Sequence, residues 1–196
     1  MRRRDRPGPA QALRGRTRFY MGAGGEALPD LLESRRALAA GGRVDPVTST
    51  VIGTVYMNQD RAAIALDYLG EAVAADPELA VAWRTFGVAL AKVNRHAEAD
   101  TAMDRAVELD PYAASGWYNR GLHHINRKRF EPAREDLLVA AGFAPDNPQI
   151  GQLIGHLERD WELADDPDLL AAAEARADSV RADLASGEWL ARNVAG

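Results

Sequence analysis

The feature that most constrains the fold of this chain is a sequence pattern that recurs every 34 residues. The segments "ADPELAVAWRTFG" (residues 75–87) and "LDPYAASGWYNRG" (residues 109–121) share an Asp-Pro pair, a Trp six residues after the Pro and a Gly four residues after the Trp. The same interval separates the members of five series, namely Trp83–Trp117, Gly53–Gly87–Gly121–Gly155, Pro77–Pro111–Pro145, Ala65–Ala99–Ala133 and Ala72–Ala106–Ala140. Several series that share one period indicate a repeated structural unit.

Within each period the spacing of apolar residues predicts two helices. Trp83, Phe86 and Leu90 recur at three- and four-residue steps, as residues on one face of a helix do. A proline lacks the amide proton that a helix interior needs, so the three prolines of the series mark where each second helix ends. Glycine costs about 1 kcal/mol relative to alanine inside a helix, so the repeated glycines indicate a close helix–helix crossing that compensates for this cost.

Taken together, these residues resemble the tetratricopeptide repeat, a helix-turn-helix unit of the same length. The resemblance implies an all-α fold, a right-handed α-solenoid of antiparallel helix pairs, with three repeats at residues 46–79, 80–113 and 114–147. The middle repeat matches the family pattern best, through Trp83, Phe86, Gly87, Leu90, Ala99, Met103, Ala106 and Pro111. In the first repeat Ser49 replaces the Trp.

The flanking residues predict caps for this array. Residues 25–45 form either an N-terminal capping helix or a degenerate repeat, with a helix predicted from about Pro29 to Ala40 that stops at Gly41–Gly42. Residues 148–196 are expected to form C-terminal capping helices, including an amphipathic one over 167–185. Residues 1–24 form a basic arm that we expect to be mostly unstructured, or partly untranslated if Met21 is the true start.

Composition and motifs exclude several classes of function. The chain has no cysteine, so it has no disulfide, thiolate metal site or cysteine nucleophile. It has no H-E-x-x-H, P-loop or G-x-S-x-G motif, and "GAGGEA" (residues 22–27) lacks the preceding strand that a dinucleotide site needs. We therefore expect no enzyme activity, metal or cofactor. The chain has no long apolar run, which leads us to expect a cytoplasmic protein without a membrane span.

One face of the predicted first helices remains available for binding. In stacked helix pairs the first helices line the inside of the curve. The candidate peptide-binding groove on this face consists of Thr54, Met57, Asn58, Val81, Arg84, Val88, Lys92, Tyr118, Leu122, Asn126, Gln152, His156 and Arg159, with Thr50 beside them. An apolar strip edged by three cations favours a peptide with apolar anchors and some acidic character.

The predicted function is a protein-interaction module or scaffold whose partner is a protein or peptide, with no convincing nucleic-acid site. Val88 and Leu153 stand where the family's carboxylate-binding members place polar or basic residues, so that clamp is not expected. Three alternatives stay open. In the first, the chain's own C-terminal helix covers the groove. In the second, the chain is an accessory subunit that presents substrate to a separate enzyme. In the third, the chain assembles with copies of itself.

Overall fold

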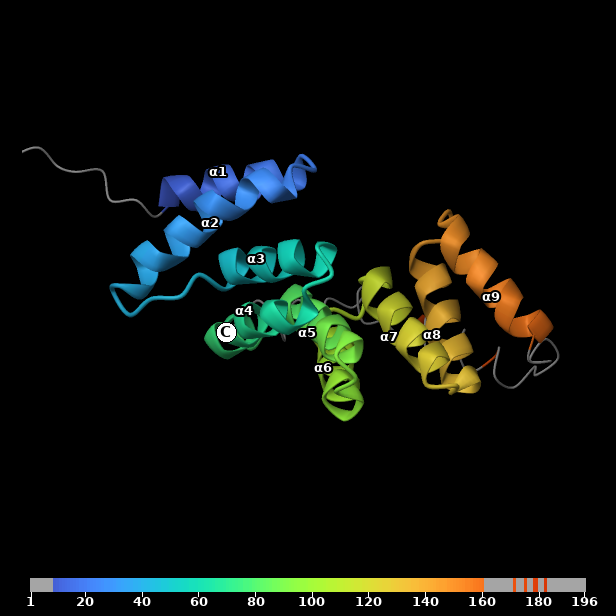
Figure 1. The fold of residues 1–196 in the computed structure, drawn as a ribbon. Helices are drawn as coiled ribbons and strands as arrows, with labels where there is room; N and C mark the ends of the chain where they lie inside the picture. The colour runs from blue at the N-terminus through green and yellow to red at the C-terminus, as the bar shows by residue number, and fades with distance from the viewer. Residues whose placement is uncertain (1–8, 161–170, 172–174, 176–177, 180–181, 183–196) are drawn as a thin grey trace, which may run out of the picture. The chain divides into compact units, whose positions relative to one another are not determined.

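The computed structural model describes residues 9–160 together with residues 171, 175, 178, 179 and 182. In this part of the chain the residues form nine helices and no strand, an all-α fold (Figure 1). The helices are α1 Pro9–Tyr20, α2 Gly24–Ala39, α3 Pro46–Asn58, α4 Ala62–Ala75, α5 Ala80–Lys92, α6 His96–Leu109, α7 Ala114–Asn126, α8 Phe130–Phe143 and α9 Pro148–Asp160. The pairs α3–α4, α5–α6 and α7–α8 lie within the residue ranges of the three repeats.

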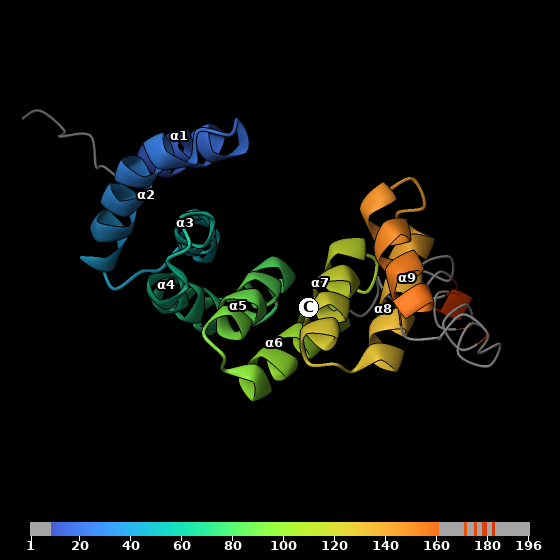
Figure 2. The same cartoon turned by 45° about the vertical axis from the view of Figure 1, so that its right-hand side comes forward.

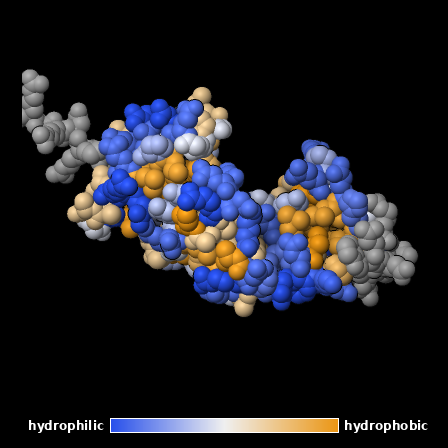
Figure 3. Space-filling view, in the orientation of Figure 1, coloured by the Kyte–Doolittle hydropathy of each residue, from blue (hydrophilic) through white to orange (hydrophobic). Residues whose placement is uncertain are grey.

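The chain divides into two compact units, unit 1 up to Arg105 and unit 2 from Ala106. In unit 1, α1 packs against α2, α3 packs against α4, and α3 also contacts α1, α2 and α5 (Figure 2). In unit 2, α7 packs against α8, and α8 packs against α9. Apolar side chains gather between α2 and α3 in unit 1 and along α8 and α9 in unit 2 (Figure 3).

The glycine and alanine series mark the crossing of the two helices of each pair. A Cβ atom added at Gly53 would lie 2.5 Å from the Cγ atom of Leu69, so the Leu69 side chain of α4 fills the space that a side chain at position 53 of α3 would need. At Gly121 the corresponding distance to the Cγ atom of Leu137 is 3.1 Å. The alanine twelve residues after each glycine is fully buried, at 0% exposure for Ala65, Ala99 and Ala133. The close crossing inferred from the glycines is therefore present.

The repeated Asp-Pro and Trp also have a physical role. The indole Nε1 of Trp83 donates a hydrogen bond of 2.8 Å to the carbonyl oxygen of Pro77. Trp117 donates the equivalent bond, also 2.8 Å, to the carbonyl oxygen of Pro111. Each Trp thereby ties the start of a first helix to the turn before it. In the first repeat, Ser49 instead donates a 3.0 Å hydrogen bond to Glu71, whose carboxylate also binds Arg35.

The turn inside each pair also repeats. Asp60, Asn94 and Lys128 follow one another at 34-residue intervals and have positive φ angles of 58°, 63° and 57°. A single left-handed residue after the first helix reverses the chain into the second.

The expectation of an unstructured arm over residues 1–24 is wrong for the described part of that arm. Residues 9–20 form α1, which pairs with α2 through a crossing of the same type as in the later repeats. A Cβ atom at Gly15 would lie 2.7 Å from Leu31, and Ala27 is fully buried. The spacings from Gly15 to Ala27 and Leu31 equal those from Gly53 to Ala65 and Leu69. Of the two interpretations of residues 25–45, the degenerate repeat is the one that fits this pairing.

Only the first part of the predicted C-terminal capping region, residues 148–160, is continuously described by the structure. Helix α9 occupies the start of the predicted cap and buries Ile150 and Leu157 in the core of unit 2, where Leu137 also lies. The amphipathic helix predicted over 167–185 lies almost entirely outside the described residues.

Candidate functional site

The candidates of unit 1 lie on two first helices that contact each other, α3 and α5. Thr54 on α3 and Val88 on α5 are half-buried and occupy the same position, one residue after the crossing glycine. Asn58 and Lys92 are exposed, five residues after that glycine. Val81, at the start of α5, is 40% exposed. We name these side chains, together with two residues of α1 described below, the first-helix surface; its members are Arg16, Tyr20, Thr54, Asn58, Val81, Arg84, Val88 and Lys92.

Two predicted groove residues lie in the core instead. Met57 is 9% exposed and belongs to the cluster that contains Leu31 and Ile52, and Thr50 is 4% exposed. Helices on both sides contact α3, and Phe19 of α1 and Phe86 of α5 both pack against the same cluster. The sequence pattern had assigned no helix to the residues of α1, so it left Met57 available to a ligand.

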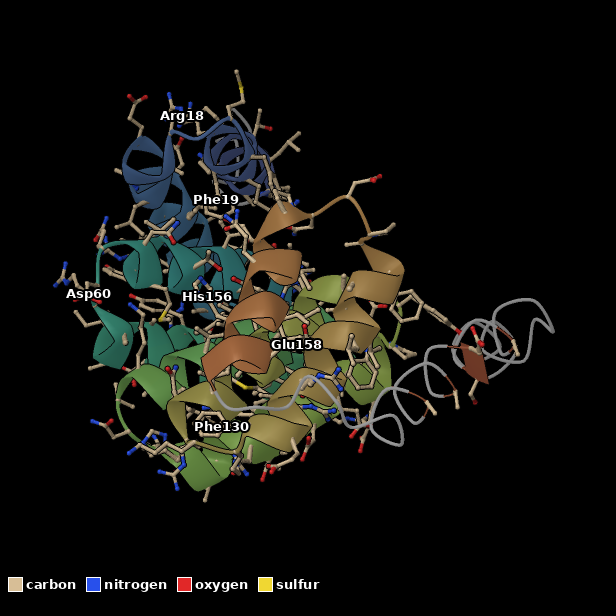
Figure 4. All side chains as sticks on the ribbon, turned by 90° about the vertical axis from the view of Figure 1, so that its right-hand side faces the viewer. Arg18, Phe19, Asp60, Phe130, His156 and Glu158 are labelled. Carbon is tan, nitrogen blue, oxygen red and sulfur yellow. The ribbon has the colours of Figure 1, made fainter. Side chains whose placement is uncertain are left out.

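Helix α1 adds residues to this surface that the sequence pattern missed. Arg16 and Tyr20 stand one and five residues after Gly15, as Thr54 and Asn58 do after Gly53. Tyr20 is 73% exposed, and its ring lies 5.3 Å from the ring of Phe19 in an edge-on arrangement. Figure 4 shows Phe19 at the end of α1. The signal that could have identified these residues is the Gly–Ala–Leu spacing that α1 and α2 share with the later repeats.

The cations on this surface have acidic partners in the fold. Lys92 Nζ lies 2.9 Å from Asp60 Oδ1 at the turn between α3 and α4, and this hydrogen bond, with the charge of Lys92, lowers the pKa of Asp60. Arg16 lies 3.4 Å from the carboxylate of Asp45, the N-cap of α3. The Lys92–Asp60 pair is solvent-exposed, so an incoming carboxylate can exchange with Asp60 at little cost.

The candidates of unit 2 lie on α7 and α9. Tyr118 and Leu122 are half-buried and Asn126 is exposed on α7. Gln152 and His156 are exposed on α9, and Figure 4 labels His156 there. Arg159 also belongs to α9, but its side chain is outside the described part of the structure. The predicted groove residues are thus divided between the two compact units.

Buried charges in both units serve the fold. In unit 1, Asp30 is 6% exposed and accepts hydrogen bonds from Arg14 Nε at 2.7 Å and Arg18 Nη1 at 2.6 Å. The hydrogen bond from Arg14 is the largest cause that lowers the pKa of Asp30. In unit 2, Asp136 accepts bonds of 2.8 and 2.7 Å from Arg120. These groups lie between the paired helices and not on the first-helix surface.

Among the residues that the structure describes, no group of three or more His, Asp or Glu side chains is arranged to hold a metal ion. No described helix combines the length and apolar character needed to cross a membrane. The cytoplasmic location stays a prediction.

Several solved structures are similar to this chain. MamA residues 41 to the end from Desulfovibrio magneticus RS-1 aligns with a TM-score of 0.67 at 19% identity, covering 93% of this chain and 97% of that one. YrrB, described as a TPR protein with an unusual peptide-binding site, aligns with a TM-score of 0.60 at 26% identity, covering 71% of this chain and 70% of YrrB. The first TPR of Spaghetti (RPAP3), bound to HSP90 peptide SRMEEVD, aligns with a TM-score of 0.57 at 19% identity, covering 60% and 93%.

Curated sequences give a shorter match. The peroxisomal targeting signal receptors of Candida glabrata and Kluyveromyces lactis are 30% and 29% identical over 97 and 98 residues. The match covers 50% of this chain but only 16% and 17% of the receptors, so the chain corresponds to about one sixth of their length. No family model matches the chain. The solved structures agree with the repeat pattern of the sequence and with its helix pairs.

Proposed function

This chain is a tetratricopeptide-repeat protein by its fold and its repeat sequence, and from that premise we propose that it is an interaction module that binds a peptide segment of a partner protein on the first-helix surface of unit 1. Thr54, Val88 and Lys92 form the central part of the binding site, and Tyr20 and Asn58 form one edge. Unit 2 carries a separate set of the predicted residues on α7 and α9, of which Tyr118, Leu122 and His156 are members.

The observation that carries this proposal is the contrast between the faces of α5. Ala82, Gly87, Ala89 and Leu90 are buried in the core of unit 1, whereas Val81 is 40% exposed and Lys92 is exposed. Val88 is only half-buried. Apolar side chains that remain accessible on an ordered helix, beside an amide and a cation, provide both apolar contact area and hydrogen-bond partners for a ligand.

The chemistry of the surface favours a peptide with an apolar side chain near an acidic one. Val81 and Val88 offer apolar contact, and Lys92 offers a cation whose partner Asp60 is itself exposed. A similar structure, RPAP3, is bound to the peptide SRMEEVD, which contains two glutamates and an aspartate. Because the helices are already formed, binding orders only the peptide, and a micromolar affinity corresponds to about −8 kcal/mol.

The test is peptide binding by the full chain, measured by fluorescence anisotropy. The probes are labelled 12-residue peptides that pair leucine or phenylalanine with glutamate, and matched peptides that carry lysine in place of glutamate. We expect micromolar binding of the acidic set and at least tenfold weaker binding of the basic set. Equal binding of both sets, or of neither, would contradict the proposal.

A matched pair of variants locates the site. Val88→Glu with Lys92→Glu changes the charge of the first-helix surface by −3, and we expect at least tenfold weaker binding of acidic peptides. The control, Thr101→Glu with Arg95→Glu, makes the same change of charge at exposed positions of α6 and of the turn before it. The control is expected to bind as the parent chain does. A loss of binding in both variants would show a nonspecific charge effect instead of this site.

A further inference from the structure

Helix α1 exposes a face that is buried in the next first helix of unit 1. In α3 this face consists of Thr48, Val51 and Val55, which are 0%, 4% and 2% exposed because they pack toward the preceding helix pair. Val55 lies next to Gly24 of α2, and a Cβ atom at that glycine would be 3.7 Å from it. Thirty-eight residues earlier, the same positions in α1 are Ala10, Leu13 and Thr17.

All three of these residues in α1 are exposed, and Leu13 is 62% exposed. Met21, one turn beyond Thr17, is 79% exposed. Two arginines border this strip, with side-chain exposures of 59% for Arg14 and 42% for Arg18. We name this strip the N-terminal face; it consists of Ala10, Leu13, Arg14, Thr17, Arg18 and Met21.

The N-terminal face has the chemistry to accept an amphipathic helix with acidic side chains. In α3 and α5 the equivalent face receives the second helix of the preceding pair, so its shape suits a helix. Arg14 and Arg18 both donate hydrogen bonds to the carboxylate of Asp30, and Glu33 acts on Arg14 only through its charge, so two partly exposed guanidinium groups border the apolar strip. An acidic partner would satisfy this charge at the edge of the contact, where ion pairs guide association and fix orientation.

The chain contains a segment with this chemistry. Residues 161–196 hold eight acidic and three basic side chains, a net charge of −5. Within them, residues 167–185 space Leu170, Ala177 and Leu184 at seven-residue intervals, with acids such as Asp168 and Asp183 between or beside them. If the segment forms a helix when it binds, this spacing puts the apolar side chains on one face.

We propose that the acidic C-terminal segment of a second copy of this chain binds the N-terminal face, so that copies associate head to tail. This inference uses a different surface from the peptide-binding one and does not depend on it. The two surfaces in contact are unlike each other, so the interface is heterologous. Repetition of such a contact produces rings or open filaments instead of a symmetric dimer.

Cross-linking tests the direction of the contact. The chain has no cysteine, so Leu13→Cys and Ala177→Cys each introduce a single thiol into the full chain. The two variants, one enlarged by a mass tag, are mixed in equal amounts and oxidised. We expect the mixed L13C–A177C product to exceed twice the amount of either product between identical variants, which is the ratio that random pairing gives. Because each copy carries one thiol, any mixed product joins two copies.

Static light scattering of the parent chain supplies the second measurement. We expect the average mass to rise with protein concentration and to fall on addition of 0.5 M salt, because salt screens the interaction between the arginines and the acidic segment. Leu13→Asp is expected to remain monomeric at concentrations where the parent associates. Ala63→Asp, at an exposed position of α4, is the control and is expected to associate as the parent does.

Two outcomes would overturn the proposal. Predominance of the L13C–L13C product would indicate a symmetric contact between two α1 helices. A constant monomer mass together with an absence of mixed product would show that the N-terminal face does not bind a second copy. Circular dichroism of each variant checks its folding, and the cysteine variants keep the test valid even where Leu13→Asp unfolds α1.

Discussion

The helix pairs α1–α2 and α3–α4 cross in the same way, but the residues beside the crossing are charged in α1–α2 and apolar or aromatic in α3–α4. Both place a leucine sixteen residues after the crossing glycine, Leu31 after Gly15 and Leu69 after Gly53, and each would contact an added Cβ atom at under 3 Å. Around this crossing, α1–α2 has Arg14, Arg18 and Asp30. The equivalent positions of α3–α4 hold Ile52, Tyr56 and Tyr68, and the two tyrosine rings stack at 5.5 Å.

The difference shows which contact defines the repeat. The Gly–Leu crossing is kept, whereas the neighbouring positions accept either an ion pair or apolar side chains. In α1–α2 the arginines remain partly in water, so burial of Asp30 carries a small desolvation cost. In α3–α4 the neighbouring helix pair covers these positions, and Ile52 is 0% exposed. In unit 2, Arg120 and Asp136 again form a charged pair at the equivalent positions.

The largest expected effect comes from placing an arginine, as found in α1, at the equivalent buried position of α3. Ile52→Arg would place a guanidinium at a fully buried position with no carboxylate at residue 68 to receive it. An uncompensated buried charge costs about 3–5 kcal/mol, so we expect unit 1 to unfold at a much lower urea concentration. Urea titration followed by circular dichroism measures the change. If Ile52→Arg unfolds like the parent, position 52 is not covered in solution and the comparison fails.

A smaller effect is expected when the ion pair of α1–α2 is broken. Asp30→Ala removes the acceptor of both arginines, which are exposed enough to regain water, and we expect a loss of about 1–2 kcal/mol. The triple variant Arg14→Ile, Arg18→Tyr and Asp30→Tyr copies the α3–α4 pattern and is expected to be at least as stable as the parent. Urea titration measures the free energy of unfolding of both variants. A triple variant less stable than Asp30→Ala would show that the ion pair is specifically required.

The crossing itself can be compared between the two units. Gly53→Ala would place its methyl 2.5 Å from Leu69, and overpacking of this kind costs about 1–3 kcal/mol, against a gain of about 1 kcal/mol in helix propensity. At Gly121 the nearest atom is 3.1 Å away, so a shift of a few tenths of an ångström suffices. We expect Gly53→Ala to lower stability by up to about 2 kcal/mol and Gly121→Ala to change it by less than about 0.5 kcal/mol. Equal effects in thermal unfolding would mean that the crossings do not differ.

The fold was largely predictable from the sequence because the pattern repeats at a constant 34-residue interval over the helix pairs from α3 to α8. Gly53, Gly87 and Gly121 repeat at 34 residues, and this interval identified the three pairs from α3 to α8. The pair α1–α2 was not predicted, because Gly15 precedes Gly53 by 38 residues and therefore does not fit the 34-residue interval. Helix α2 is two residues longer than α4, and the linker after it, 40–45, is two residues longer than 76–79.

The candidate site was less predictable, because it depends on which surfaces tertiary contacts cover. Met57 follows the repeat pattern of a groove residue, yet it lies in the core cluster against which residues of α1 and α5 pack. The arginines of the N-terminal region suggested a solvated tail by composition alone. Their meaning depends on Asp30 and Asp45, which lie far along the sequence and meet Arg14 and Arg16 only after the helices pair. Local patterns cannot supply such partners.

The smallest predicted effect is a pH dependence confined to α1–α2. Because the arginines hold the pKa of Asp30 below its ordinary value, the folded state binds fewer protons at this site than the unfolded state does. The stabilisation is therefore complete above the unfolded pKa, near 4, and is lost as the pH falls through the lower folded value. We expect the melting temperature of the parent to fall more steeply between pH 5 and pH 3 than that of the triple variant. The triple variant differs from the parent only at positions 14, 18 and 30, so the difference between the two curves isolates the Asp30 carboxylate and its two arginines. Parallel curves would mean that the carboxylate is not held ionised by the two arginines.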